Sequence, residues 1–120
     1  MKKIYHLSTC STNQRILKEL KPGKDFELQE IKTEKISAKQ LDEMKKRSGS
    51  YEALFSRRAM KYREWGLHEK ELSEKEMRDC ILKEYTFLKR PVIIIDDEIF
   101  CGSGKNEIAK AKAKMKNKKV

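Results

Sequence analysis

Short apolar runs alternate with amphipathic stretches along the first third of the chain. Residues 4–7 contain three apolar side chains and are typical of a strand, and Ile16, Leu17 and Leu20 follow with the spacing of one helix face. After a Lys-Pro-Gly-Lys-Asp turn, residues 26–31 predict a second strand in which Phe26, Leu28 and Glu30 alternate with their neighbours. Because crossover connections are right-handed, these two strands are expected to be parallel.

Residues 37–87 have helical spacing throughout and contain no convincing strand. Two capping boxes, Ser37 with Gln40 and Ser73 with Glu76, predict helix starts. Between them, residues 51–65 predict one helix that ends at Gly66. The helix after Ser73 is expected to bury an inner face made of Met77, Cys80, Ile81 and Tyr85.

Strands return at residues 92–96, a β-branched run typical of a strand buried on both faces. A tight turn over residues 96–98 and a returning strand over residues 99–101 complete a hairpin. Ser103 is the expected N-cap of a last helix, in which Ile108 and Ala109 should face inward. The predicted order is strand, helix, strand, helical block, strand, strand, helix.

Composition favours one domain with a modest core. The chain has 120 residues, of which 38% are hydrophobic and 40% are charged. It contains no apolar run of about 18 residues, so no membrane span is expected. The first residues lack the apolar stretch of a signal peptide, which favours a cytoplasmic protein.

The net charge of +10 is concentrated at the C-terminal end, where the last sixteen residues hold seven lysines against Glu107. Two interpretations remain: the exposed end of a helix, or an electrostatic contact with nucleic acid or an acidic partner. Alternating Ala and Lys favours the exposed helix. No aromatic residues interrupt the lysines, so direct nucleic-acid binding is not expected.

Cys10 lies between the first predicted strand and the helix that follows it. Unpaired backbone N–H groups and the helix dipole favour negative charge at a helix start, so a thiolate is stabilised there. His6 and Arg15 would add to this effect if their positive charges lie close to the sulfur. The alternative is that Cys10 is a small buried hydrophobic residue, as free cysteines often are.

Cysteine spacing argues against disulfides and against a zinc site. Cys10, Cys80 and Cys101 are odd in number, and no two of them have C-x-x-C spacing. Cys80 is expected on the inner face of a helix and Cys101 in a buried strand. Buried thiols are inert, so neither is expected to resolve a disulfide at Cys10.

Three motifs together resemble the arsenate reductase (ArsC)/Spx family of the thioredoxin superfamily. They are K-I-Y-H-L-S-T-C-S-T-N-Q-R, A-L-F-S-R-R-A-M-K-Y-R-E-W-G-L and L-K-R-P-V-I-I-I-D-D-E-I-F-C-G, and the resemblance runs from residue 4 to about residue 111. It implies an α/β fold: a thioredoxin-like βαβ-ββα mixed sheet with an all-helical insertion after the second strand. The single domain, 1–120, would have a core at about 1–36 and 88–120 and an insertion at about 37–87.

The resemblance also implies site residues. Cys10 matches the nucleophilic cysteine, and His6 matches a histidine that helps to ionise it in glutaredoxin-linked arsenate reductases. Arg90 matches the arginine that contacts the bound oxyanion, and Pro91 would be a cis-proline. The remaining candidates for the substrate or anion site are Ser11, Thr12, Asn13, Arg15 and Arg58.

The chain also departs from the arsenate reductase pattern. Ser56 and Gly102 stand where two further anion-binding arginines are expected, and Arg57 and Arg58 are adjacent to the first of these positions. Arg58 instead matches a functional arginine of the Spx transcriptional regulators. Spx proteins usually carry C-x-x-C, whereas Asn13 occupies the place of the second cysteine here, so a disulfide between positions 10 and 13 cannot form.

Two functions follow from the resemblance, and a third stays open. The favoured function is a thiol-dependent reductase in which Cys10 attacks an arsenate-like oxyanion or a mixed disulfide. An external thiol, glutathione or a glutaredoxin, would complete the cycle, with glutathione as co-substrate and no bound cofactor. The alternative is a Spx-like redox or stress regulator that binds RNA polymerase without turnover. A fold that has lost its chemistry and serves another partner is the third.

Overall fold

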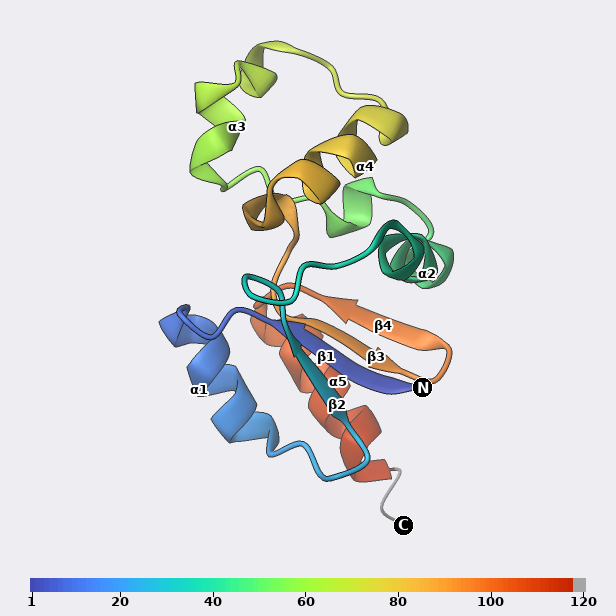
Figure 1. Cartoon of the computed structure of the whole chain (residues 1–120). Helices are drawn as coiled ribbons and strands as arrows, with labels where there is room; N and C mark the ends of the chain where they lie inside the picture. The colour runs from blue at the N-terminus through green and yellow to red at the C-terminus, as the bar shows by residue number, and fades with distance from the viewer. Residues whose placement is uncertain (118–120) are drawn as a thin grey trace. The chain divides into compact units, whose positions relative to one another are not determined.

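The computed structural model describes residues 1–117 and divides the chain into two compact units. The first combines Met1–Lys35 with the chain from Arg90 onward, and the second is Ile36–Lys89. Figure 1 shows strands β1 to β4 in the first unit, whereas the second is built from helices and loops. Among the described residues, no helix is long and apolar enough to cross a bilayer.

The first unit contains a four-stranded mixed sheet. Its strands are β1 (Lys2–His6), β2 (Glu27–Glu30), β3 (Val92–Ile95) and β4 (Glu98–Cys101), in the spatial order β2-β1-β3-β4. β1 and β2 are parallel, while β3 is antiparallel to both β1 and β4. The predicted α/β class, the parallel first pair and the hairpin are therefore confirmed. All four residues of β3 are buried, as their β-branched run predicts.

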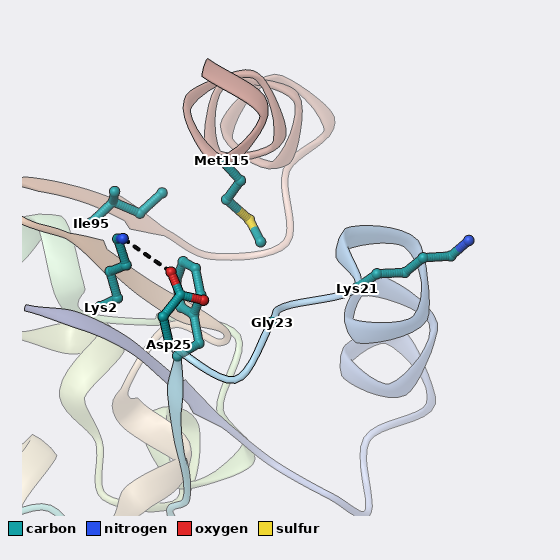
Figure 2. A pocket seen from close by; sticks show the side chains of 7 residues that line it. Lys2, Lys21, Gly23, Asp25, Ile95 and Met115 are labelled. Carbon is teal, nitrogen blue, oxygen red and sulfur yellow. Dashed lines mark hydrogen bonds and ion pairs between the residues drawn. The ribbon is translucent and has the colours of Figure 1, made fainter. Parts of the chain in front are cut away.

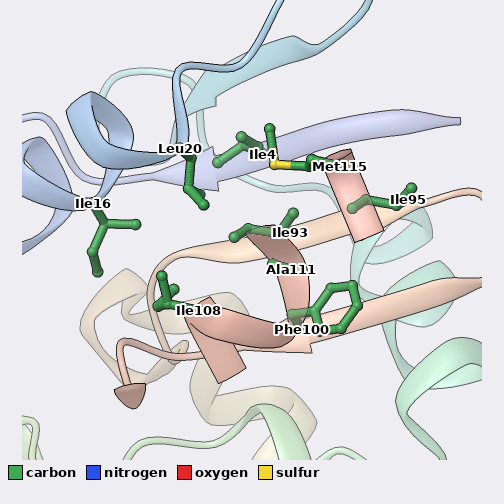
Figure 3. Close-up of a cluster of buried hydrophobic side chains, with 9 residues drawn as sticks. All are labelled: Ile4, Ile16, Leu20, Ile93, Ile95, Phe100, Ile108, Ala111 and Met115. Carbon is green, nitrogen blue, oxygen red and sulfur yellow. The ribbon is translucent and has the colours of Figure 1, made fainter. Parts of the chain in front are cut away.

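Helices α1 (Ser11–Leu20) and α5 (Lys105–Asn117) pack on one face of this sheet. Figure 3 shows their side chains meeting those of the strands in one cluster, made of Ile4, Ile16, Leu20, Ile93, Ile95, Phe100, Ile108, Ala111 and Met115. Ile108 points inward as predicted. The prediction for Ala109 is wrong, because Ala109 is exposed and Ala111 occupies the core. The buried positions 108, 111 and 115 follow the spacing of a helix face.

The start of α5 also differs from the prediction. The first backbone hydrogen bond of this helix runs from the Ile108 N–H to the carbonyl oxygen of Gly104, with an N···O distance of 3.0 Å. That bond makes Gly104 the N-cap position, one residue after the expected Ser103. Ser103 is exposed and precedes the helix.

β2 is an edge strand. The alternation of apolar and polar residues along it suggests that Leu28 is buried, but Gln29 is buried instead. Leu28 is 47% exposed, whereas Gln29 is 2% exposed. The Gln29 Nε2 atom donates a hydrogen bond to the carbonyl of Glu34, with N···O 3.0 Å. A buried amide is tolerated in this strand because it has such a partner.

The second unit contains three α-helices and three single-turn 3-10 helices: α2 (Ala38–Ser48), η1 (Glu52–Leu54), α3 (Met60–Glu64), η2 (Leu67–Glu69), α4 (Glu74–Lys83) and η3 (Tyr85–Phe87). Both predicted capping boxes are present, with Ser37 and Ser73 as N-caps. Gly66 has φ +70° and follows Trp65, the C-cap of α3, as predicted for a residue that ends a helix.

The predicted continuous helix over residues 51–65 is wrong. Phe55 forms an antiparallel β-bridge with Leu88 and separates η1 from α3. The Ser56 amide donates to the Phe87 carbonyl at 2.7 Å, and the Phe55 ring stacks on the Phe87 ring with centroids 5.3 Å apart. Because these backbone groups find partners in a distant segment, the local helical preference is overridden.

The inner face of α4 is also shorter than predicted. Met77 and Ile81 are buried, and Cys80 is half-buried. The helix ends at Lys83, so Tyr85 belongs to η3 instead.

An ion pair joins α2 to α4 within the second unit. The Asp42 carboxylate accepts hydrogen bonds from Arg78 Nε at 2.9 Å and Arg78 Nη2 at 3.2 Å. The Tyr51 hydroxyl donates to the same carboxylate at 2.6 Å. The hydrogen bonds from Arg78 and Tyr51 lower the pKa of Asp42 to about 2, so this carboxylate is charged at neutral pH.

Candidate active site at Cys10

Cys10 occupies the N-cap position of α1. The prediction that it lies between the first strand and the following helix is therefore confirmed. Its backbone is extended, with φ −92° and ψ 115°, and its carbonyl accepts the amide of Gln14 at 3.0 Å. The Cys10 amide donates to the carbonyl of Leu7 at 3.1 Å, which closes the turn between β1 and α1. The side chain is half-buried. The sulfur therefore belongs to the residue that opens a ten-residue helix, makes no capping hydrogen bond to that helix, and remains partly open to solvent.

Asn13, one turn into α1, links this sulfur to the end of β1. Its side-chain oxygen accepts the Leu7 amide at 3.0 Å, and its Nδ2 atom donates to Cys10 Sγ at 3.6 Å. The residue is 1% exposed. Both ends of the amide are thus engaged inside the protein.

Glu30, at the end of β2, holds the other side of the cysteine turn. Its carboxylate accepts hydrogen bonds from the amide and hydroxyl of Ser8 at 2.9 and 3.0 Å. It also accepts the amides of Lys32 and Thr33 at 2.7 and 2.8 Å and the Thr33 hydroxyl at 3.1 Å. We call this set of five hydrogen bonds the Glu30 clasp.

The clasp also determines the charge on Glu30. Partial burial raises the pKa of Glu30, but the hydrogen bonds from Thr33 and Ser8 outweigh it and lower the pKa to about 2. Gln14 adds a further contact to the turn, because its Nε2 donates to the Ser8 carbonyl. The turn that carries Cys10 is therefore fixed from α1 and from β2.

Arg90 and Pro91 lie at the same edge of the sheet as the end of β1. Tyr5 pairs with Val92 in the antiparallel register, so His6, which follows Tyr5, and Pro91, which precedes Val92, are neighbours at this edge. The Arg90–Pro91 peptide bond is cis, as the resemblance implies. Arg90 is half-buried, and its Nη1 atom is buried without a hydrogen-bond partner among the described residues. A guanidinium N–H in that situation is suited to an anionic ligand.

His6 is the last residue of β1 and is half-buried. Strand alternation places its side chain on the same face as Ile4, the face on which α1 packs. Its Nδ1 atom is buried and has no hydrogen-bond partner within residues 1–117. An imidazole nitrogen without a fixed partner can accept or hold a proton.

The other predicted anion-site residues differ in position. Ser11 and Arg15 are exposed on the first turns of α1, and Thr12 is half-buried. Arg58 is exposed in the second unit, where its backbone amide donates to the Ser56 hydroxyl at 3.3 Å. All the candidates except Arg58 belong to the first unit.

Neither remaining cysteine has the surroundings of Cys10. Burial raises the pKa of the Cys80 thiol, which keeps it protonated and weakly nucleophilic at neutral pH. Cys101 lies in β4, as predicted, but it is half-buried and not fully buried. It pairs with Val92 on the sheet face opposite to Ile93 and Phe100, and therefore opposite to α1.

A small hollow lies at the far end of the same unit. Figure 2 shows it between Lys2, Asp25 and Met115, with Lys21, Gly23, Phe26 and Ile95 completing the lining. The Lys2 Nζ atom and the Asp25 carboxylate pair at 3.0 Å. Lys2 pairs with Ile95 in the sheet register, at the end remote from His6 and Pro91. No group of three or more metal-ligating side chains is present in the part of the chain that the structure describes.

Sequence reasoning missed the Glu30 clasp, the Gln14 contact and the internal role of Asn13. Part of the clasp is local in the chain, because the Lys32 and Thr33 amides lie two and three residues after Glu30. A glutamate at the end of a strand is only a weak sequence signal for such bonds. The bond between Ser8 and Glu30 joins residues 22 positions apart and has no signal in the sequence. It depends on the parallel pairing of β1 with β2.

The fold and the site together define a thioredoxin-like protein: a mixed four-stranded sheet with a cysteine at the start of its first helix and an arginine–cis-proline bond at the same sheet edge. A family model described as the ArsC family matches residues 5–111. The chain belongs to the ArsC family. The search of curated proteins found no match.

Solved structures show the same fold. An arsenate reductase from Vibrio cholerae is 19% identical with a TM-score of 0.72, over 91% of this chain and 95% of that one. An arsenate reductase (ArsC)-related protein from Brucella melitensis is 24% identical with a TM-score of 0.69, over 96% and 94%. A possible arsenate reductase from Streptococcus mutans is 25% identical with a TM-score of 0.62, over 82% and 87%.

Proposed function

We propose that this chain is a thiol-dependent reductase of the ArsC family, with Cys10 as its nucleophile. The observation that supports this most directly is the position of Cys10 Sγ, at the N-cap of α1 with an amide hydrogen bond from Asn13. Both features favour the thiolate over the thiol. The thiolate is the form that attacks.

The proposed substrate is a tetrahedral oxyanion such as arsenate or, alternatively, a mixed disulfide. The first turn of α1 offers backbone N–H groups, and Arg90 offers a guanidinium N–H without a partner among the described residues. Ser11 and Thr12 stand on that turn and Arg15 begins the next, and all three would complete the anion site. Anion binding next to a thiolate needs this positive potential, because like charges otherwise repel.

With arsenate, the Cys10 sulfur would bond to arsenic and displace one oxygen, which leaves as hydroxide and is protonated to water. An external thiol such as glutathione then attacks the sulfur of Cys10. The sulfur–arsenic bond breaks and its electron pair goes to arsenic, giving arsenite and a mixed disulfide. A second thiol, from glutathione or a glutaredoxin, would release Cys10. Because position 13 is asparagine, the chain needs that external thiol.

His6 would serve as the proton acceptor that helps to ionise Cys10. Its buried Nδ1 lacks a partner among residues 1–117, and its side chain lies on the sheet face that packs against α1. Ser56 and Gly102 stand where two further anion-binding arginines are expected, so arsenate would meet fewer positive charges in this chain. The mixed-disulfide substrate needs fewer positive charges and stays in the proposal for that reason.

The test is an arsenate reduction assay with glutathione and a glutaredoxin, run beside Cys10→Ser and Arg90→Ala. We expect turnover in the wild type, none in Cys10→Ser and a rise in KM for Arg90→Ala. The same three proteins are assayed with a glutathione mixed disulfide. Wild-type inactivity with both substrates would contradict the proposal.

A second candidate function is supported by the surface of the second unit. Arg58 is exposed, and nearby in the chain Met60 is 83% exposed and Trp65 is 43% exposed. Exposed apolar side chains beside a cation are typical of a protein-binding surface. A Spx-like regulator would bind RNA polymerase through such a surface without turnover. Co-purification with polymerase subunits, lost in Arg58→Glu, would favour this function.

A further inference from the structure

Asn13 is an uncommon residue for the inside of a small protein. It is 1% exposed, and it lies beside the half-buried Cys10. A buried primary amide is costly unless its oxygen and its nitrogen both find partners. Here the oxygen accepts the Leu7 amide at 3.0 Å, and the nitrogen donates to Cys10 Sγ at 3.6 Å. The side chain therefore bridges the last turn before the helix and the sulfur itself.

The Leu7 amide fixes which end of Asn13 faces the sulfur. A backbone N–H can only donate, so it selects the side-chain oxygen. Turning the amide over would place two donors face to face and leave the Leu7 N–H without a partner inside the protein. The NH2 group must consequently point towards Cys10 Sγ.

That direction matters for the charge on the sulfur. A thiolate only accepts hydrogen bonds, and a bond from an amide to a charged acceptor is stronger than the same bond to a thiol. The NH2 group of Asn13 thus favours the thiolate and holds it towards α1. This stabilisation of the thiolate adds to that from the helix dipole of α1, and it requires no second cysteine.

We propose that Asn13 is a positioning residue for Cys10: its amide, locked by Leu7, holds the sulfur as a thiolate at the start of α1. The proposal rests on the proposed function, because a positioned thiolate matters only if Cys10 reacts. It gives position 13 a role in ionising Cys10 that requires no second thiol.

The test compares Asn13→Asp with Gln14→Glu. Asn13→Asp keeps an oxygen for the Leu7 amide but replaces the donor to sulfur by a negatively charged oxygen. Gln14→Glu makes the same amide-to-carboxylate change one residue further on, where the wild-type amide contacts the Ser8 carbonyl and not the sulfur. The readout is the rate of iodoacetamide alkylation against pH, followed by mass spectrometry of the peptide that contains Cys10. Thiolate absorbance at 240 nm provides a second measure of ionisation.

We expect the midpoint of the alkylation profile to rise by about one pH unit or more in Asn13→Asp, with about a tenfold lower rate at pH 7. Gln14→Glu should shift the midpoint by less than half as much. Equal shifts in the two variants, or an unchanged midpoint in Asn13→Asp, would overturn the proposal. If Asn13→Asp does not fold by circular dichroism, Asn13→Ser replaces it. Its shorter side chain loses the amide donor, and an unchanged midpoint there would also overturn the proposal.

The two proposals fail separately, because alkylation needs no substrate. A chain that shows the shift but no turnover contradicts the proposed reductase and leaves the role of Asn13 intact. A chain with turnover but no shift contradicts the role of Asn13 alone.

Discussion

Replacing Glu30 by glutamine should loosen the turn that carries Cys10. Four of the five bonds in the Glu30 clasp come from Ser8 and Thr33, and the fifth comes from the Lys32 amide. In Glu30→Gln, one carboxylate oxygen becomes an NH2 group. The backbone amides of Ser8, Lys32 and Thr33 can only donate, so an NH2 group in either place leaves at least one of them without its acceptor. The hydrogen bonds that remain no longer involve a charge.

The magnitude follows from the number and exposure of these bonds. Hydrogen bonds to a charged group contribute about 1.5–3 kcal/mol when buried, but Glu30 is only half-buried and water replaces part of the loss. We therefore expect the free energy of unfolding to fall by about 1–2 kcal/mol in Glu30→Gln. For a chain of 120 residues this corresponds to a Tm lower by about 4–8 °C.

The effect should depend on pH in a defined direction. The pKa of Glu30 in the folded protein is lowered from the ordinary value of 4.5 to about 2. Since the folded pKa is the lower of the two, the stabilisation is fully present above about pH 5 and is lost as the pH falls towards 2. The stability difference between wild type and Glu30→Gln should accordingly shrink between pH 5 and pH 3.

Urea unfolding followed by circular dichroism at pH 7, 4 and 3 measures this difference. Glu34→Gln is the matched control, because Glu34 is exposed in the same turn and its side chain makes no ion pair or hydrogen bond with residues 1–117. Hydrogen exchange at the Ser8 and Thr33 amides gives a local readout, and both should exchange faster in Glu30→Gln. A difference below about 0.5 kcal/mol at pH 7, or one that does not change with pH, would refute the reasoning.

Three further changes test the core, the caps and the sulfur. Ile93→Ala removes a fully buried side chain of the sheet. We expect it to lower the free energy of unfolding, measured by urea titration, by about 3 kcal/mol. A loss below about 1 kcal/mol would contradict the packing described. Ser73→Ala removes a capping box and should cost about 1 kcal/mol, whereas the control Ser103→Ala precedes its helix and should cost less than about 0.5 kcal/mol. Asn13→Cys places a second thiol beside Cys10, and the two thiols should form a disulfide on mild oxidation. The disulfide is detected as the loss of two titratable thiols. Full retention of both thiols would contradict the close approach of position 13 to the Cys10 sulfur.

The location of the candidate nucleophile could be predicted from the sequence, but its surroundings could not. Cys10 stands where an apolar run gives way to helical spacing, and that change of period is a local pattern. Asn13 was predicted as an anion-site residue, and its buried amide engaged at both ends became evident only from the structure. Glu30 could not be found because its contact with Ser8 depends on the pairing of two strands.

The same distinction holds for the helices. Both capping boxes were predicted correctly because the bonds of each box join residues three positions apart. The helix over residues 51–65 was predicted wrongly because Phe55 and Ser56 bond to a segment more than thirty residues away. In α5, Ala109 was predicted wrongly because it is only the chain neighbour of Ile108, whereas the buried helix face recurs every three to four residues, at Ala111 and Met115.

The sequence by itself determined the order of strands and helices, the first pair of parallel strands, the buried third strand and the cysteine at a helix start. These depend on hydrophobic period, capping and chain connectivity, which act between neighbouring residues. Tertiary structure alone decided the Glu30 clasp, the orientation of Asn13 and the interruption at Phe55. Each of these is a hydrogen bond or a choice of conformation that exists only once packing has excluded water and brought its partner within reach.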